Sequence, residues 1–118
     1  LTDYPVEKWG KLIEKYHAFP SNTNVHFISV ESDQLLNVFV WERGSGPTLA
    51  CGTGACACAA VSYSLGLCKS QLEVKLPGGI LEISWPNKNS NIYMTGPAEK
   101  VYSGQFELID FTEVENNG

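Results

Sequence analysis

A cysteine stands directly before a Gly-Thr-Gly sequence, at a place where a helix is expected to begin. The cysteine is Cys51, and the residues after Gly54 are mostly small helix formers. The first N–H groups of a helix have no partner within the helix, so with the helix dipole they favour an anion, which glycine lets approach the backbone. Thiols at helix N-termini also lose their proton more readily. Cys51 could therefore act as a nucleophile or base beside a bound anion.

A charged pair, Glu42 and Arg43, precedes this cysteine by a few residues. Arg43 is the only arginine of the chain, and a guanidinium can hold a carboxylate through two parallel hydrogen bonds. A thiolate beside a bound carboxylate is well placed to remove the proton from the adjacent carbon. The pattern therefore fits a small substrate that carries carboxylate and ammonium groups.

Each of these features also has an ordinary structural interpretation. A lone cysteine before a helix is more often structural than catalytic, a Glu-Arg pair is usually a surface ion pair, and the glycines could serve turns. Their concentration within the thirteen residues 42–54 favours a functional site. The Gly52-x-Gly54-x-x-Ala57 spacing also fits a degenerate dinucleotide-binding fingerprint, but a loop rather than a strand directly precedes it.

The elements that must position these residues can be predicted from apolar spacing and composition. Helices are expected at residues 6–16 and 52–65, the second ending at Gly66. Strands are expected at 25–30, 35–41, 72–76, 80–85, 92–95 and 101–109, with a loop at 42–50 and an acidic tail at 112–118. This order lacks a βα alternation, which predicts an α+β fold with mainly antiparallel pairing. The small side chains of the second helix indicate that other elements surround it closely.

Composition and charge exclude several classes of protein. The chain has 118 residues and a net charge of −5, which argues against a nucleic acid or an anionic membrane surface as the main partner. No apolar run approaches the roughly 20 residues of a membrane span, and residues 1–10 lack the apolar core of a signal peptide. The expected location is therefore the cytoplasm. The chain starts with Leu1 and not Met, which suggests that it is a piece of a longer protein.

The remaining cysteines and the histidines give no sign of a metal site. Cys56, Cys58 and Cys68 follow Cys51 at a spacing without a CxxC pair, so we expect no zinc and no disulfide. Cys56 and Cys58 are interpreted as helix packing residues and Cys68 as structural. His26 is interpreted as a packing or surface residue without a role.

Several segments of the chain resemble the diaminopimelate epimerase family. The longest, residues 42–57, reads Glu-Arg-Gly-Ser-Gly-Pro-Thr-Leu-Ala-Cys-Gly-Thr-Gly-Ala-Cys-Ala and resembles the C-terminal signature of that family. Further matching segments are residues 19–27, 76–81 and 95–98. The resemblance extends from about Tyr4 to Phe106. Proline racemases share the Cys-Gly-Thr-Gly element but lack the Glu-Arg-Gly that precedes it here.

The resemblance implies a fold and an activity. The family consists of cofactor-independent isomerases that interconvert LL- and meso-diaminopimelate in lysine biosynthesis. Its fold has two pseudo-symmetric halves, each a mainly antiparallel, barrel-like sheet wrapped around a central helix. Two cysteines on opposite faces of the α carbon exchange the proton, one as thiolate base and one as thiol acid. No cofactor is implied.

The resemblance also assigns residues to the two ends of the substrate. Cys51 would be one of the catalytic pair, and the backbone N–H groups of Gly52 and Thr53 would bind the carboxylate at the reacting end. Arg43 and Asn24 would hold the distal carboxylate. Glu42 would face the distal ammonium group and also tune the pKa of the catalytic thiol.

The second catalytic cysteine has no counterpart in these 118 residues. Cys56 and Cys58 share the expected helix with Cys51, so they cannot reach the opposite face of a substrate. We therefore expect residues 1–118 to be the C-terminal domain of a larger enzyme, inactive without an N-terminal half that acts as its partner. A homodimer is left open. Two alternatives remain, a stand-alone module that binds a small acid and another cofactor-independent racemase of the proline racemase type.

Overall fold

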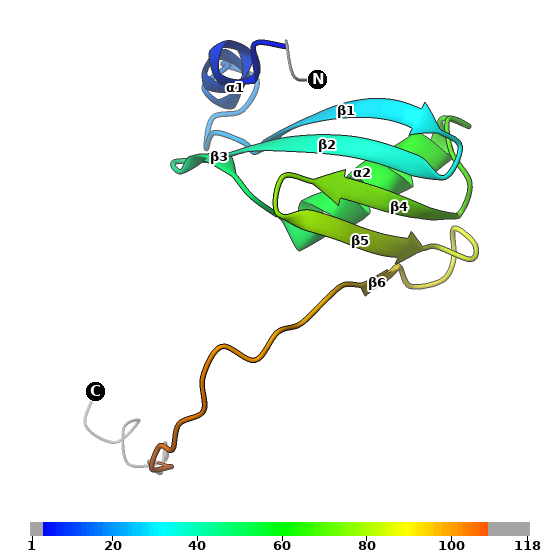
Figure 1. Ribbon diagram of the computed structural model, residues 1–118. Helices are drawn as coiled ribbons and strands as arrows, with labels where there is room; N and C mark the ends of the chain where they lie inside the picture. The colour runs from blue at the N-terminus through cyan, green and yellow to red at the C-terminus, as the bar shows by residue number, and fades with distance from the viewer. Residues whose placement is uncertain (1–3, 109–118) are drawn as a thin grey trace, which may run out of the picture.

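The computed structural model of the chain describes residues 4–108. Its elements follow in the order α1 (Val6–Glu14), β1 (Val25–Ser32), β2 (Leu35–Glu42), β3 (Gly46–Thr48), α2 (Gly52–Ser64), β4 (Gln71–Leu76), β5 (Gly79–Ser84) and β6 (Tyr93–Thr95). The strands form one sheet in the order β1-β2-β4-β5-β6, with β3 paired to β2 (Figure 1). The predicted α+β class is confirmed.

The pairing of the strands is mainly antiparallel, as the sequence predicts. The hairpins β1–β2 and β4–β5 account for most of the sheet, and the turn of the second hairpin is formed by Pro77 and Gly78. The pair β2–β4 is parallel. A parallel pair needs a long crossover connection, and here that connection contains α2. The helix is therefore placed against the sheet by the route of the chain itself.

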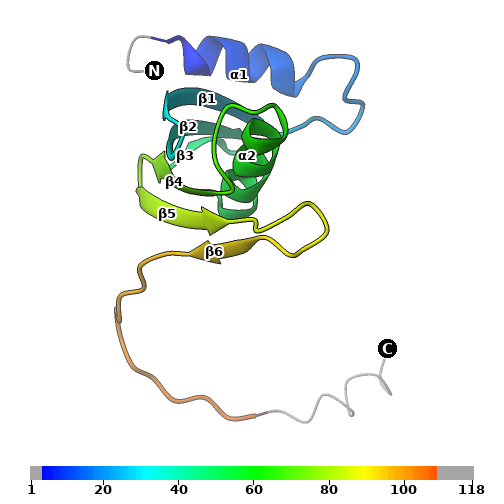
Figure 2. The same cartoon turned by 90° about the vertical axis from the view of Figure 1, so that its right-hand side faces the viewer.

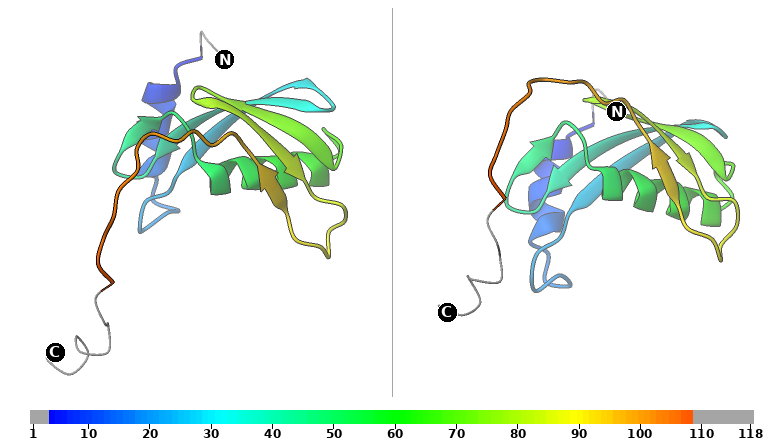
Figure 3. Two further views of the ribbon diagram at one scale, coloured as in Figure 1. Left: turned by 60° about the horizontal axis from the view of Figure 1, so that its bottom comes forward. Right: turned by 90° about the horizontal axis from the view of Figure 1, so that it is seen from below.

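The core lies between α2 and the inner face of the sheet. Figures 2 and 3 show α2 along one face of the sheet, with the strands curving around it. In β4 every second side chain is buried, so Leu72, Val74 and Leu76 point inward while the polar residues between them are exposed. Ala55 and Ala59 meet this face from the helix and are almost fully buried. Small side chains let the helix and sheet approach closely, as the composition predicts.

The helix α1 covers the opposite face of the sheet at the end of β2. Its buried residues are Gly10 and Glu14, and Gly10 lies directly against the ring of Trp41. Several apolar residues of the predicted helix 6–16 are largely exposed, with Leu12 56% and Tyr16 54% exposed. The helix therefore docks through its smallest residue and a carboxylate, and presents much of its apolar surface outward.

Four sequence predictions need correction or comment. The strand expected at 101–109 is wrong over residues 101–108, which have no regular structure. β3 lies inside the segment predicted to be a loop and was missed because it is only three residues long. The predicted helix 6–16 ends earlier, at Glu14. The expected tail at 112–118 lies outside the described residues.

The segment after β6 runs away from the rest of the fold. Figures 1 and 2 show residues 96–108 leaving the sheet as an extended stretch. Its apolar side chains are 84–89% exposed, namely Val101, Tyr102, Phe106 and Leu108. None of the helices within residues 4–108 is long and apolar enough to cross a membrane.

Candidate active site

Cys51 is the residue that precedes the first turn of α2. Its backbone is extended, with φ −146° and ψ 101°, and its carbonyl accepts the N–H of Ala55 at 2.8 Å. The three N–H groups before Ala55 therefore precede the first hydrogen bond within the helix. The half-buried thiol lies beside them, with Sγ 3.7 Å from Oγ1 of Thr53. The structure thus places the thiol at the start of a helix, beside N–H groups that precede its first hydrogen bond.

The segment that enters this helix is held by the second hairpin. The carbonyl of Leu49 accepts the N–H of Gly78 at 2.7 Å. A Cβ on Gly78 would lie 2.9 Å from that carbonyl oxygen, so the close approach requires glycine. On the other side of the helix start, Met94 of β6 covers Gly52, because a Cβ there would meet its Cε at 3.0 Å. Residues of two hairpins therefore position the start of α2.

His26 also lies at this helix start, which the sequence interpretation did not foresee. It pairs with Val40 across β1 and β2, so its side chain is on the sheet face that meets α2. A Cβ on Gly54 would overlap Nε2 of His26 and would lie 3.0 Å from Sγ of Cys51. Its position was missed because only the pairing of β1 with β2 under α2 brings it to the cysteine.

Burial and a nearby carboxylate shift the pKa of His26 in opposite directions. Burial lowers the pKa of His26, and the negative charge of Glu42 raises it by a smaller amount. Glu42 is half-buried at the end of β2 and accepts a hydrogen bond from Oγ1 of Thr48 at 3.0 Å. Glu42 is thus fixed in orientation by β3, the strand that the sequence did not predict.

Arg43 and Asn24 form a second group of predicted site residues. The backbone N–H of Arg43 donates to Oδ1 of Asn24 at 2.8 Å, and its Nη1 donates to the carbonyl of Ser21 at 3.2 Å. Both side chains are exposed. Within residues 4–108, no hydrogen bond joins this group to the group around Cys51. The six predicted residues therefore fall into one cluster at the helix start and one at the end of β2, where Glu42 directly precedes Arg43 in the sequence.

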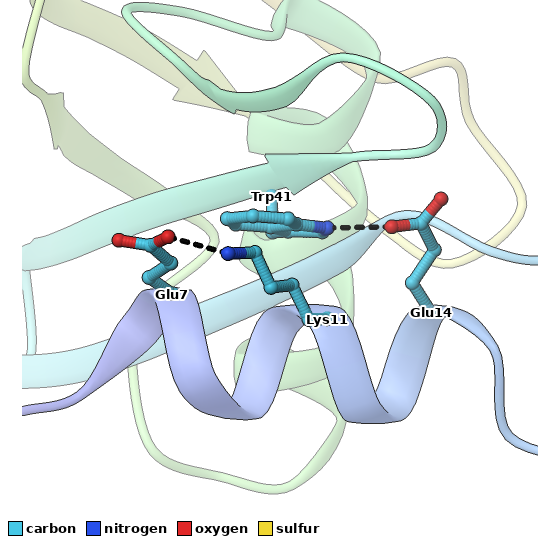
Figure 4. A network of polar contacts seen from close by, with 4 residues as sticks. All are labelled: Glu7, Lys11, Glu14 and Trp41. Atoms are coloured by element: carbon cyan, nitrogen blue, oxygen red, sulfur yellow. Dashed lines mark hydrogen bonds and ion pairs between the residues drawn. The ribbon is translucent and has the colours of Figure 1, made fainter.

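The loop that carries Arg43 is anchored from α1 by a buried carboxylate. Glu14 accepts hydrogen bonds from Nε1 of Trp41 at 2.7 Å and from the N–H of Gly44 at 2.9 Å. Figure 4 shows the indole of Trp41 lying over α1, with Glu14 at its nitrogen and Lys11 beneath its ring. The hydrogen bond from Trp41 is the main reason that the pKa of Glu14 is lowered, and the N–H of Gly44 adds to it. This carboxylate joins α1, β2 and the Arg43 loop.

The other three cysteines have the character of packing residues. Burial raises the pKa of Cys58 to about 11, and burial also raises the pKa of Cys56 and of Cys68. Cys58 and Cys68 are buried in the core cluster, and Cys56 packs against it. All four thiols are free. Among residues 4–108, no three His, Cys, Asp or Glu side chains are grouped as a metal site would require.

The structure thus places a thiol beside unpaired helix N–H groups and an exposed arginine on a neighbouring loop. Residues 2–101 match the sequence model of the family described as "Diaminopimelate epimerase". The chain belongs to the diaminopimelate epimerase family.

Individual relatives agree with this assignment. A protein named diaminopimelate epimerase from Prochlorococcus marinus (strain MIT 9313) is 55% identical to this chain over 88% of the chain's length. A protein of the same name from Natranaerobius thermophilus is 54% identical over 81% of the chain. One from Methanococcus maripaludis (strain C5) is 46% identical over 92% of this chain. The matched region covers 34%, 32% and 39% of the length of these three relatives, respectively. The chain therefore spans about a third of the length of the curated relatives it matches.

Proposed function

We propose that this chain is part of a cofactor-independent diaminopimelate epimerase and that Cys51 is one of its two proton-transfer residues. The observation that carries the proposal is the position of Cys51, whose sulfur lies beside the unpaired N–H groups at the start of α2. Membership of the family and the names of the relatives supply the substrate, diaminopimelate.

The proposed reaction needs the thiol and the helix start together. In one direction, the thiolate of Cys51 takes the proton from the α carbon. The substrate carboxylate on that carbon accepts hydrogen bonds from the N–H groups of Gly52 and Thr53, which stabilise the negative charge that develops there. A thiol on the opposite face then donates a proton to the α carbon, which inverts its configuration. In the reverse direction the two thiols exchange these roles.

The distal end of the substrate is assigned to the second cluster. Arg43 would pair with the distal carboxylate, and the amide of Asn24, which already holds the backbone of Arg43, would contribute to the same contact. Glu42 would face the distal ammonium group. Glu42 acts electrostatically on His26 at the helix start, and its proposed tuning of the Cys51 thiol stays a prediction.

The opposite thiol is proposed to come from a part of the enzyme outside these residues. Cys58 and Cys68 are buried in the core, and Cys56 packs against it on the helix that Cys51 precedes. The relatives are about three times longer than the matched region. The exposed apolar side chains of residues 101–108 also support a neighbouring domain that covers them. We propose that this domain is the N-terminal half of the same enzyme.

Conversion of LL-diaminopimelate by the full-length protein tests the proposed function. The expected result is formation of the meso isomer without any added cofactor. The two isomers are separated and quantified by chiral chromatography. Proline offered as an alternative substrate should not be racemised. Binding of diaminopimelate without conversion would instead support the stand-alone binding module, and racemisation of proline would support the other racemase class.

A further inference from the structure

The fold leaves one buried nitrogen atom of His26 without a hydrogen-bond partner. Nε2 is buried and has no partner among the residues from 4 to 108. Buried polar side-chain atoms are nearly always paired, so an unpaired one calls for an explanation. His26 also stands among apolar neighbours on the inner face of β1, where it pairs with Val40. A histidine is not needed there for packing.

The neighbouring group that could pair with this nitrogen is the thiol of Cys51. Nε2 of His26 and Sγ of Cys51 both adjoin the space that a Cβ on Gly54 would occupy. Because Gly54 has no side chain, the imidazole and the sulfur flank the same opening in the first turn of α2. The sulfur is carried by a single rotatable bond, so a change in that bond alone can bring it toward or away from the imidazole.

The chemistry of a neutral imidazole suits this position. Burial disfavours the charged form of His26 more strongly than Glu42 favours it, so the ring is neutral near pH 7. A neutral imidazole carries one N–H donor. The titratable groups around it are Glu42 on β2 and Cys51 before α2. The thiol is the group that adjoins Gly54 together with Nε2.

We propose that His26 is a positioning residue whose Nε2–H donates a hydrogen bond to the thiolate of Cys51, which holds the sulfur in its reactive orientation and favours its ionised form. The inference deepens the proposed function and rests on it for its biological meaning. Its physical content, a hydrogen bond between two named atoms, can be tested without the substrate.

The pH dependence of Cys51 alkylation in the full-length protein tests this hydrogen bond. Iodoacetamide reacts with the thiolate, and peptide mass spectrometry separates Cys51 from the other cysteines. In His26→Leu, which fills similar space without a donor, the alkylation rate of Cys51 at pH 7 should fall about tenfold, as expected for the loss of one hydrogen bond to a charged group. The midpoint of the pH curve should move upward.

A conservative variant separates the hydrogen bond from packing. His26→Gln keeps an N–H donor near the position of Nε2 and should retain a rate close to that of the wild type. Ile28→Val is the matched control, because Ile28 packs against the same core from the same strand face, and it should leave the rate unchanged. Equal rates in the Leu variant and the wild type would overturn the proposal, as would equal losses in the Leu and Gln variants.

A spectroscopic measurement decides the matter if His26→Leu fails to fold. In wild-type protein with ¹⁵N-labelled histidine, the Nε2 resonance of His26 should show the protonated nitrogen and should shift when Cys51 is alkylated. A bare Nε2 in the neutral ring at pH 7, or no response to alkylation, would overturn the proposal. Absence of epimerase activity in the wild type would refute the proposed function and leave the alkylation and resonance results to decide on His26.

Discussion

The residues around Cys51 illustrate how a short motif can place several chemical groups in one site. A cysteine that precedes a helix lies beside the N–H groups of the first turn, so local geometry brings Gly52, Thr53 and the thiol together. Arg43, the residue proposed to bind the distal carboxylate, is different, since its loop is held by hydrogen bonds from distant parts of the chain. The two clusters therefore depend on different features of the fold.

The thiol of Cys51 can be tested by its closest isostere. In the full-length enzyme, Cys51→Ser should lower turnover at least about a hundredfold, the lower end of what a general acid–base group contributes. The fold should be unchanged, because only the sulfur is replaced. Turnover is measured by conversion of diaminopimelate and the fold by circular dichroism. Cys56→Ser on the same helix is the control, and near-normal turnover in Cys51→Ser would remove this thiol from the reaction.

The role of Arg43 can be tested by keeping its charge and changing its shape. Arg43→Lys should raise KM roughly tenfold while kcat changes less, because lysine cannot make two parallel hydrogen bonds to a carboxylate. Lys69→Arg, in an exposed ion pair with Asp33, is a control that should leave KM unchanged. An unaltered KM in Arg43→Lys would contradict the assignment to the distal carboxylate.

At the scale of single residues, the sequence indicates the parts of the site that are continuous along the chain. Cys51, Glu42 and Arg43 stand within one segment, and their types alone suggested their chemistry. His26 is 25 residues before Cys51, and its proximity depends on β1 pairing with β2 beneath α2. A lone histidine in a strand carries no local signal of such a contact.

The secondary-structure elements that support the Arg43 loop meet at Glu14. This carboxylate belongs to α1 and accepts hydrogen bonds from β2 and from the loop after it. Gly10 allows the same helix to approach the ring of Trp41. The contact between α1 and β2 should therefore be sensitive both to the charge of Glu14 and to the size of residue 10.

The charge of Glu14 predicts a dependence of stability on pH. Its pKa is lower in the fold than the ordinary value of 4.5, because Nε1 of Trp41 and the N–H of Gly44 donate to the carboxylate. The stabilisation is therefore complete above pH 4.5 and is lost as the pH falls through the lower value of the folded state. Urea unfolding should show Glu14→Gln less stable than the wild type at pH 7, with the difference shrinking toward pH 3. A difference that does not vary with pH would contradict this account.

The close packing of α1 on Trp41 predicts that a methyl group added at Gly10 lowers the stability of the fold. Gly10→Ala would gain about 1 kcal/mol of helix propensity, but its Cβ would lie within 2.9 Å of three atoms of Trp41. Overpacking of this kind costs about 1–3 kcal/mol, so we expect a net loss of stability in urea unfolding. Lys8→Ala on the exposed side of α1 is the control. A more stable Gly10→Ala variant would show that α1 can move away from Trp41.

At the scale of elements, strong local patterns predicted the two helices and the two long hairpins. The strand β3 could not be predicted, because Gly46, Pro47 and Thr48 resemble a loop and pair only because the end of β2 is adjacent. The strand that was wrongly predicted at 101–109 has the opposite explanation. Those residues have strand-like composition, but within residues 4–108 no neighbouring strand pairs with them.

Among residues 4–108, the exposed apolar surface includes two segments that the predictions from sequence had placed in regular elements. One is the extended segment with Tyr102 and Phe106, and the other is α1 and the turn after it, with Leu12 and Tyr16. From the sequence, the first was predicted to be a strand and the second part of a helix. A strand needs a partner surface, which the proposed N-terminal half would supply for the extended segment.

Burial of the extended segment in the full-length enzyme follows from this proposal. Hydrogen exchange of residues 101–108, followed by mass spectrometry of their peptides, should be much slower in the full-length protein than in the 118-residue chain. Protection of the β4–β5 hairpin serves as the internal reference that the domain itself is folded in both samples. Equally fast exchange of residues 101–108 in both would indicate that no other domain covers them.

We propose that Cys51 works with a second thiol from outside these 118 residues. This pairing can be tested by replacing, in the full-length enzyme, each cysteine outside this chain by serine and measuring both conversion between the isomers and solvent deuterium incorporation at the α carbon. One such replacement should abolish conversion, as is also expected of Cys51→Ser. Full conversion after all cysteines outside the chain have been replaced would contradict it.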